Sequence, residues 1–378
     1  MKHLLFRPLP VYVIVILALT LIAFYVPEKR EKMIRILLMV LSALLAHIIH
    51  ELGHTLFGLA AGLRFIEYTV GFFTVDASTG KLRFLENKQW KNMGGLVKFV
   101  PTSMSIQETM KQWKMLVIGG PLTSLAFGLV ALNFSRLPVA THLDFFLFMA
   151  GLLNLGIGIL TLIPNRGGTY YSDGSILRLL QQGGTRSEQY LHFILLSPHI
   201  YTAAPPSQWP IALIRQAENS LSASPGFDSQ SDVLLEAQLR MQLYYFYIDR
   251  GDLEHAAGLL LPIVYRPRDQ HKYRIELQNI DSFYITHHFV FGNEPNDLDV
   301  VADRISPKEP YSYNKTQAIR LARQGKYAEA GNALNKADQM YESWFKPFGF
   351  GRVERMLLKK IKQHFELHVK TGEGTYRW

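Results

Sequence analysis

Apolar residues dominate four stretches in the first half of this chain, each about as long as the roughly 20 helical residues needed to cross a bilayer. These stretches are residues 10–26, 36–61, 115–134 and 143–163. From about residue 187 the apolar runs are too short to span, and apolar positions recur at helical spacing instead. The pattern predicts a mainly α protein, in which a polytopic membrane core of about four spans precedes a soluble α-helical domain.

The predicted boundary gives a membrane domain of residues 1–180 and a soluble domain of residues 187–378. Three stretches of the soluble domain are typical of two helices joined by a turn, with Gly251, Gly292 and Gly325 at the turns. The sequence around the first and third glycine weakly resembles the centre of tetratricopeptide repeats, although the glycine spacing is irregular. We expect a helical repeat-like domain. It either binds a protein partner, as stacked hairpins often do, or is a plain helical domain without one.

Two other segments of the soluble domain lead to expectations. Residues 203–228 contain four prolines and are predicted to form a linker or loop. Residues 352–370 combine basic and apolar side chains at helical spacing. Such a helix either lies on an anionic membrane surface or packs its apolar side on the domain.

The amino-acid composition limits which residues can bind a metal and which partners are expected. The chain has no cysteine, so disulfides and thiolate metal ligands are excluded and any metal must be held by His, Asp or Glu. Its net charge of +9 is explained by Lys and Arg flanking the spans, and no compact basic motif with interleaved aromatic residues predicts a nucleic-acid partner. Most of the flanking basic residues lie near the N-terminus and in residues 62–114. With four spans, that side also carries the C-terminal domain, which we therefore expect in the cytoplasm, on a multi-pass protein of the cell membrane.

The second apolar stretch contains the sequence His50-Glu51-Leu52-Gly53-His54. Residues four apart lie on one face of a helix, so His50 and His54 can present their imidazoles to a single cation. This is the HExxH pattern, in which the glutamate, here Glu51, acts as a base toward water at a metal ion. Ionisable groups inside a membrane helix are costly and mark a functional site by default. We favour a metal site over a hydrogen-bonded structural cluster, and catalytic zinc needs a third protein ligand.

Asp173 is predicted to lie at the same membrane depth as the two histidines. The fourth apolar stretch ends at Pro164, which interrupts a helix, and Gly167 and Gly168 permit a tight path to Asp173. The histidines also lie toward the C-terminal half of their own span. Both spans run toward the same side in the predicted topology, so the two motifs should meet.

The chain from about residue 36 to 180 resembles the site-2 protease family of intramembrane zinc metalloproteases. The family couples an HExxH helix to a later LDG-type aspartate on a core of three transmembrane helices. His50, Glu51 and His54 match the first motif, and Asp173-Gly174 matches the second. The resemblance implies one Zn²⁺ ion held by His50, His54 and Asp173, with Glu51 as the catalytic base.

Two further elements are similar to that family. The Gly-Gly-Pro sequence at residues 119–121, followed by Ser124, looks like a Gly-Pro pair that lies between the two motifs. Residues 94–98 are similar to a Gly-Gly-Tyr-Val-Lys sequence where members form a small sheet, so we expect a small β element that can pair with a substrate strand. Thr161 departs from the family, in which many members have Asn at that place. Asn154 either supplies an amide to the site or packs inside the bundle.

These features predict an enzyme, a zinc metalloendopeptidase of the site-2 protease type. Its substrates would be membrane proteins or peptides, cut in or near transmembrane segments. The alternative is a catalytically idle membrane scaffold that recruits partners through its helical C-terminal domain. Intact His50, Glu51, His54 and Asp173 favour the enzyme, because an idle relative would be free to lose them. A zinc transporter is disfavoured, because transport does not need the glutamate.

Overall fold

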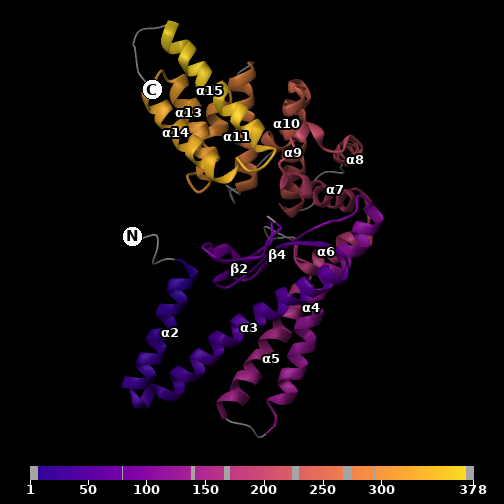
Figure 1. The fold of residues 1–378 in the computed structure, drawn as a ribbon, viewed down its shortest axis with the longest axis vertical. Coiled ribbons are helices and arrows are strands. Elements are labelled where there is room, and N and C mark those ends of the chain that lie inside the picture. The colour runs from indigo at the N-terminus through magenta and orange to yellow at the C-terminus, as the bar shows by residue number, and fades with distance from the viewer. Residues whose placement is uncertain are drawn as a thin grey trace. The chain divides into compact units, whose positions relative to one another are not determined.

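The computed structural model describes residues 7–78, 80–137, 141–165, 171–223, 230–266, 275–292 and 295–371. The protein is mainly α-helical, as predicted, and contains one small β-sheet (Figure 1). The chain divides into two compact units, Met1–Ser187 and Glu188–Trp378. The candidate site lies in the first unit.

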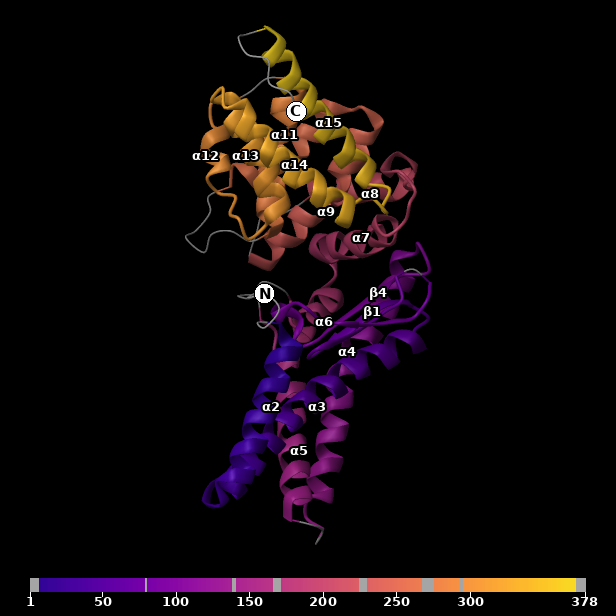
Figure 2. The same ribbon diagram turned by 60° about the vertical axis from the view of Figure 1, so that its left-hand side comes forward.

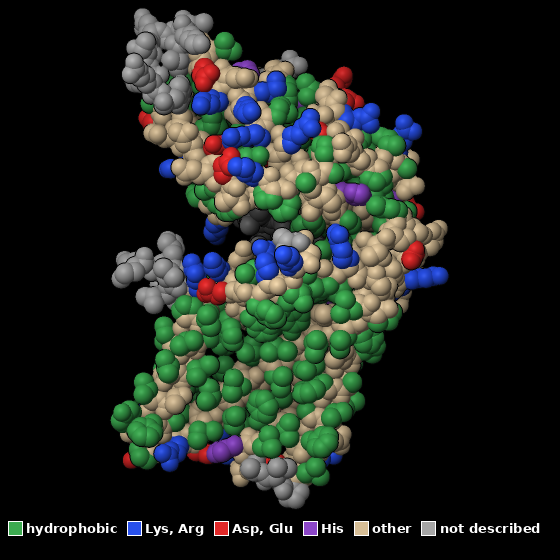
Figure 3. Space-filling model, in the orientation of Figure 1, with side chains coloured by type: hydrophobic (Ala, Val, Ile, Leu, Met, Phe, Trp, Pro, Cys, Tyr) green, Lys and Arg blue, Asp and Glu red, His purple; other side chains and the backbone are tan. Residues whose placement is uncertain are grey.

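Four helices of the first unit are long and apolar enough to cross a membrane. They are α2 (Pro8–Tyr25), α3 (Arg30–Ala60), α4 (Ile106–Phe134) and α5 (Thr141–Leu162). The four predicted stretches lie almost wholly within them, and α3 and α4 begin earlier than predicted because their polar first turns are helical too. Hydrophobic side chains cover this part of the molecule, and charged side chains gather at its two ends, as expected for helices that face lipid (Figure 3).

Helices α3, α4 and α5 pack against one another, and α2 packs on α3 (Figure 2). Glycines let the first three approach closely. A Cβ atom at Gly53 would lie 2.5 Å from the carbonyl oxygen of Gly119, and one at Gly119 would lie 2.6 Å from the carbonyl oxygen of Gly53. Gly128 and Gly151 bring α4 and α5 together in the same way. Close packing at small residues is the usual basis of helix association in membranes, where lipid removes the hydrophobic driving force.

A four-stranded antiparallel sheet follows α3, where a small β element was predicted. Its strands are β1 (Arg64–Val70), β2 (Phe73–Asp76), β3 (Arg83–Glu86) and β4 (Leu96–Val100), in the spatial order β3-β2-β1-β4. Glu67 of β1 faces Lys98 of β4, and their side chains form an ion pair at 2.6 Å. The hydroxyl of Tyr68 donates to the carbonyl oxygen of Ile48 at 3.1 Å, which fixes β1 to α3.

Two further helices follow the bundle in sequence, α6 (Asp173–Gln182) in the first unit and α7 (Gly184–Ile200), most of which belongs to the second unit. The other helices of the second unit are α8 (Ile211–Ser222), α9 (Gln230–Arg250), α10 (Leu253–Val264), α11 (Ile275–Phe291), α12 (Leu298–Ala302), α13 (Pro310–Arg323), α14 (Tyr327–Trp344) and α15 (Gly351–Thr371). Gly251, Gly292 and Gly325 follow α9, α11 and α13 with positive φ, the usual way to end a helix before a turn. The resemblance of these helix pairs to tetratricopeptide repeats stays a prediction.

The predicted linker at residues 203–228 is wrong in its central part. Helix α8 lies there, with Pro210 directly before it and the apolar side chains of Leu213, Ile214 and Leu221 buried. A proline at a helix start removes no helical hydrogen bond, so Pro210 marks the start of this helix rather than preventing it. Residues 224–229 of the segment lie outside the described residues. In α15 the apolar side is buried in the domain, which is the second of the two predicted alternatives.

Candidate metal centre

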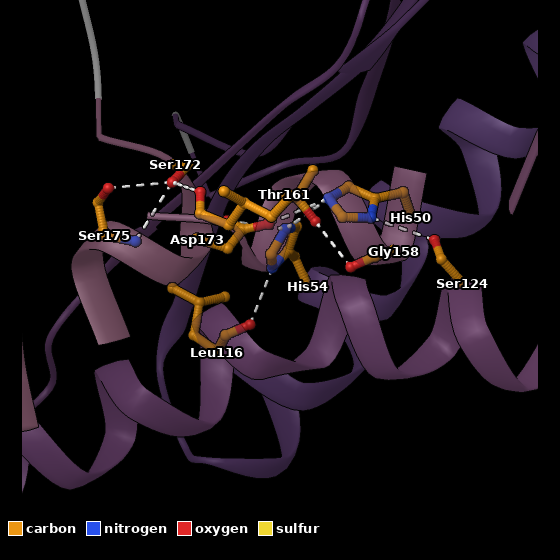
Figure 4. A network of polar contacts seen from close by, with 10 residues as sticks. His50, His54, Leu116, Ser124, Gly158, Thr161, Ser172, Asp173 and Ser175 are labelled. Atoms are coloured by element: carbon orange, nitrogen blue, oxygen red, sulfur yellow. Dashed lines mark hydrogen bonds and ion pairs between the residues drawn. The ribbon is translucent and has the colours of Figure 1, made fainter. Parts of the chain in front are cut away.

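Helix α3 presents His50 and His54 one turn apart, and α6 begins at Asp173. Figure 4 shows the three side chains pointing toward one another. Nε2 of His50 lies 3.3 Å from Oδ2 of Asp173, and Nε2 of His54 lies 3.6 Å from Oδ1. The two Nε2 atoms are 3.3 Å apart. The structure thus brings together the three residues predicted as ligands, and they form a group that could hold a metal ion.

These separations suit a small cation. A zinc ion that bonds nitrogen and oxygen at about 2.0–2.1 Å in a tetrahedron holds its ligand atoms about 3.3 Å apart. The separations here are 3.3, 3.3 and 3.6 Å. The side chains of His50, His54 and Asp173 are only 8%, 11% and 17% exposed, which shields such an ion from bulk water. The donor set fits zinc, as it fits other divalent ions that accept nitrogen and oxygen ligands.

The outer nitrogen of each imidazole is held by α4. Nδ1 of His54 lies 2.9 Å from the carbonyl oxygen of Leu116, which only accepts, so Nδ1 carries the proton and Nε2 presents a lone pair. Nδ1 of His50 lies 3.1 Å from Oγ of Ser124. With the same tautomer at His50, three acceptor atoms face one another. A cation or added protons must offset their mutual repulsion, and orienting contacts of this kind are typical of metal-bound histidines.

Asp173 is held in place where the chain leaves α5. The hydroxyl of Ser172 donates to the carbonyl oxygen of Ile163 at 2.9 Å. The same oxygen accepts from the N–H of Ser175 and caps the first turn of α6 (Figure 4). A Cβ atom at Gly174 would lie 1.8 Å from the carbonyl oxygen of Leu162, so only glycine fits there. The Asp-Gly pair therefore has a physical reason. The glycine lets the chain approach the end of α5, and this approach fixes the aspartate.

Asp173 presents a carboxylate to the site. Burial raises its pKa, but without a metal ion, added protons on Nε2 of His50 and His54 would point at the carboxylate, outweigh burial and lower the pKa to about 2. The side chain is therefore ionised at neutral pH, as a metal ligand must be.

Glu51 lies beside these groups and interacts electrostatically with His54 and Asp173. Its carboxylate lies against the backbone of Gly95, where φ is +126°, and a Cβ atom at Gly95 would be 2.1 Å from Oε1 of Glu51. Gly95 directly precedes β4, so the sheet forms one wall next to the glutamate. The Gly-Gly pair at residues 94–95 was noted in the sequence, but its contact with Glu51 was not predicted.

The remaining residues that drew attention in the sequence have different places. The amide nitrogen of Asn154 donates to the carbonyl oxygen of Ala150 at 2.8 Å within α5, as a packing residue would. The hydroxyl of Thr161 lies 3.5 Å from the carbonyl oxygen of Gly158, also within α5 (Figure 4). The turn at residues 167–168 lies outside the described residues.

Three contributions from α4 escaped prediction. A Cβ atom at Gly120 would lie 2.3 Å from Nε2 of His54, so this glycine leaves the space that the ligand nitrogen occupies. Gly120 and Ser124 belong to the Gly-Gly-Pro element noted in the sequence, which is the signal that could have linked them to the histidines. The carbonyl of Leu116 gives no such signal, because any residue has one.

Comparisons with protein-family models, with curated proteins and with solved structures find no match for this chain. Its function must therefore be argued from the geometry described above.

Proposed function

We propose that this protein is an intramembrane zinc metalloprotease of the site-2 protease type. The observation that carries the proposal is the convergence of His50, His54 and Asp173, with Glu51 next to them. Two histidines, a carboxylate ligand and a free glutamate are the donor set and base of known zinc peptidases. A purely structural cluster would have no use for the glutamate.

The location of these residues favours a substrate within the membrane. His50, Glu51 and His54 lie in a helix apolar enough to span a bilayer. Polar groups at such a place are expensive unless they serve a function. A peptide bond in a transmembrane helix has its carbonyl already hydrogen-bonded, so a substrate must unwind locally before it is cut. The sheet next to Glu51 offers an extended surface against which an unwound strand can pair.

The chemistry divides between the ion and Glu51. A bound zinc ion supplies Lewis acidity toward a carbonyl or a water molecule. The carboxylate of Glu51 accepts a proton from the attacking water, whose oxygen bonds to the carbonyl carbon of the substrate. When the C–N bond breaks, Glu51 returns that proton to the amine that leaves. Ser124 and the carbonyl of Leu116 hold the histidine rings throughout.

The orientation is part of the proposal. Four membrane passes place the N-terminus, the sheet and the second unit on one side. The Lys and Arg residues near the N-terminus and in residues 62–114 make that side the cytoplasm. A scaffold without activity, the alternative, would have the same topology. The two therefore differ in turnover alone.

The test uses the full-length protein in lipid vesicles together with a pool of single-span membrane peptides. Mass spectrometry should find new peptide ends with the wild type. Glu51→Gln should retain its zinc and lose about a hundredfold to ten-thousandfold in cleavage rate, the range of general acid–base catalysis. Glu31→Gln, a change of the same kind at an exposed end of α3, is the matched control and should cleave normally.

Two results would contradict the proposal. Cleavage by Glu51→Gln at the wild-type rate would remove the glutamate from the mechanism. The absence of new peptide ends from a zinc-loaded wild type across the pool would favour the scaffold.

A further inference from the structure

The β-sheet of the first unit has a polar face and an apolar face. Residues that lie directly opposite each other on neighbouring strands share a face, and successive residues of one strand alternate between faces. On the polar face, Thr69 and Thr74 share a hydrogen bond at 2.8 Å. Asp76 and Arg83, on the same face, form an ion pair. Groups of this kind are typical of a surface in contact with water.

The apolar face points toward the membrane helices. Tyr68 of β1 lies opposite Val75 of β2, and Val75 lies opposite Phe84 of β3, so the three side chains form one row across this face. The hydroxyl of Tyr68 donates to the carbonyl oxygen of Ile48 in α3 at 3.1 Å. Helix α3 is long and apolar enough to cross a membrane. The row therefore begins on a spanning helix and continues outward from it.

The protein covers only the inner part of this row. Tyr68 is 8% exposed and Val75 is half-buried, whereas Phe84 at the outer strand is 80% exposed. Leu82, two residues before Phe84, is 67% exposed. Neighbouring apolar side chains that are this exposed favour contact with a membrane or another protein over contact with water.

Two contacts with α2 fix the depth of this edge of the sheet (Figure 1). The guanidinium of Arg7, the residue before α2, forms an ion pair with Glu86 of β3 at 3.4 Å. The ring of Tyr12, in the second turn of α2, packs on the ring of Phe72 directly before β2, with centroids 5.7 Å apart. Helix α2 is one of the four candidate spans, so its first turns lie where the acyl chains of a bilayer begin. The edge of the sheet lies at the same depth.

From these contacts and exposures we infer that the β3 edge of the sheet is a lipid-binding surface, on which Leu82 and Phe84 contact the acyl chains of the bilayer that holds α2–α5. Phospholipid fits this surface because Lys81 and Lys88, at the two ends of β3, are exposed and can reach headgroup phosphates. The contact anchors the sheet next to the candidate metal centre. The inference depends on the four helices being membrane spans and does not depend on protease activity.

The experiment uses the full-length protein, which has no cysteine, so a single introduced cysteine can carry a nitroxide spin label. The variants Leu82→Cys and Phe84→Cys are labelled in vesicles of phosphatidylcholine and the anionic phosphatidylglycerol. Electron paramagnetic resonance compares collisions of the label with oxygen and with a polar nickel complex. Oxygen concentrates among acyl chains and the complex stays in water, so the oxygen-to-nickel collision ratio should be about tenfold higher at both positions than in water.

Leu85→Cys is the matched control. Leu85 follows Phe84 in β3 and is 47% exposed, but it lies opposite Thr74 on the polar face of the sheet. Its label should therefore give the low ratio of a group in water. Leu129→Cys, at a position of α4 that is 57% exposed, reports whether the helices are inserted and should give a high ratio. Ser343→Cys, on the exposed side of α14, provides the ratio in water.

A ratio at Phe84→Cys as low as that at Leu85→Cys, together with a high ratio at Leu129→Cys, would overturn the inference, because the sheet would stand in water beside an inserted bundle. Protection of Leu82→Cys and Phe84→Cys from both oxygen and nickel would also overturn it and would assign the surface to protein, such as a second copy of the chain. A low ratio at Leu129→Cys would refute the membrane spans and the inference with them. Cleavage activity takes no part in this test, so its outcome is independent of the protease proposal.

Discussion

Replacing Ser124 by alanine tests the contact that orients His50. When Nε2 of His50 binds a metal ion, Nδ1 carries the proton and donates to Oγ of Ser124, 3.1 Å away. Without the hydroxyl, that buried N–H loses its partner. The ring can then move its proton to Nε2 and point it at the carboxylate of Asp173 instead. That tautomer has no lone pair on Nε2, the nitrogen that faces the site, so the substitution should favour the metal-free state.

The magnitude follows from burial. Ser124 is fully buried, so water does not readily replace the missing hydroxyl. An unpaired buried donor costs about 1–3 kcal/mol. Loss of the outer partner of a ligand histidine typically lowers metal affinity about 10- to 100-fold, which corresponds to about 1.4–2.7 kcal/mol. We expect zinc affinity to fall within this range.

The assay is competition for zinc between the purified protein and a chromophoric chelator. Ser42→Ala is the matched control. Ser42 is a fully buried serine of α3, and its hydroxyl donates to the carbonyl oxygen of Phe146 at 3.2 Å. Its loss should cost stability without changing zinc affinity by more than about twofold. Equal zinc affinities for Ser124→Ala and Ser42→Ala would refute the reasoning, because both lose one buried hydroxyl and only one of these hydroxyls contacts His50.

Three further predictions concern the candidate metal site and a buried histidine of the second unit. Gly120→Ala should lose its metal ion, because the new Cβ atom would lie 2.3 Å from Nε2 of His54. Gly156→Ala is the control and should keep its metal ion, because no atom lies within 4 Å of its new Cβ. Elemental analysis of both purified variants measures the metal content. A chelator should lower the unfolding temperature of the zinc-loaded wild type and leave Asp173→Asn unchanged, since a ligand at 100 times its Kd stabilises by about 2.7 kcal/mol. In the second unit, burial and then a neighbouring histidine lower the pKa of His287 to about 4. Because an unfolded histidine has a pKa of about 6.5, the free energy of unfolding should fall as pH drops from 6.5 to 4, by up to about 1.4 kcal/mol per pH unit. Urea unfolding of His287→Phe should show a flatter profile in that window, and an unchanged slope would contradict the assignment.

The confirmed predictions of helical elements depend on residues close together in sequence. Four runs of apolar residues identify the four long helices, because a bilayer requires length and apolar composition more than particular contacts. The approach of Asp173 to the histidines was foreseen from membrane depth, which is a long-range inference that the bilayer makes simple. For residues in spanning helices, the predicted topology fixes the depth along the membrane normal, and residues at equal depth in packed helices can meet.

The contacts that refine the site could not be foreseen in this way. Ser124 lies 74 residues from His50, and Leu116 lies 62 residues from His54. Both contacts depend on how α3 and α4 cross. The close approach of these helices depends on Gly53 and Gly119, and the sequence does not reveal that these two glycines face each other. The buried pair of Lys315 and Glu354 was missed for a related reason. From sequence alone, a charged residue in a helix is expected to be exposed, unless its partner is known.

The most direct test of the central claim is the zinc content of the purified protein, compared with that of Asp173→Asn and of His54→Ala. Asp173→Asn keeps the size of the side chain and removes the charge that completes the donor set. The account predicts close to one zinc ion per wild-type chain and a loss of most of it in both variants at the same free zinc concentration. Full zinc occupancy in either variant would show that these side chains, although 3.3 to 3.6 Å apart, do not hold the metal.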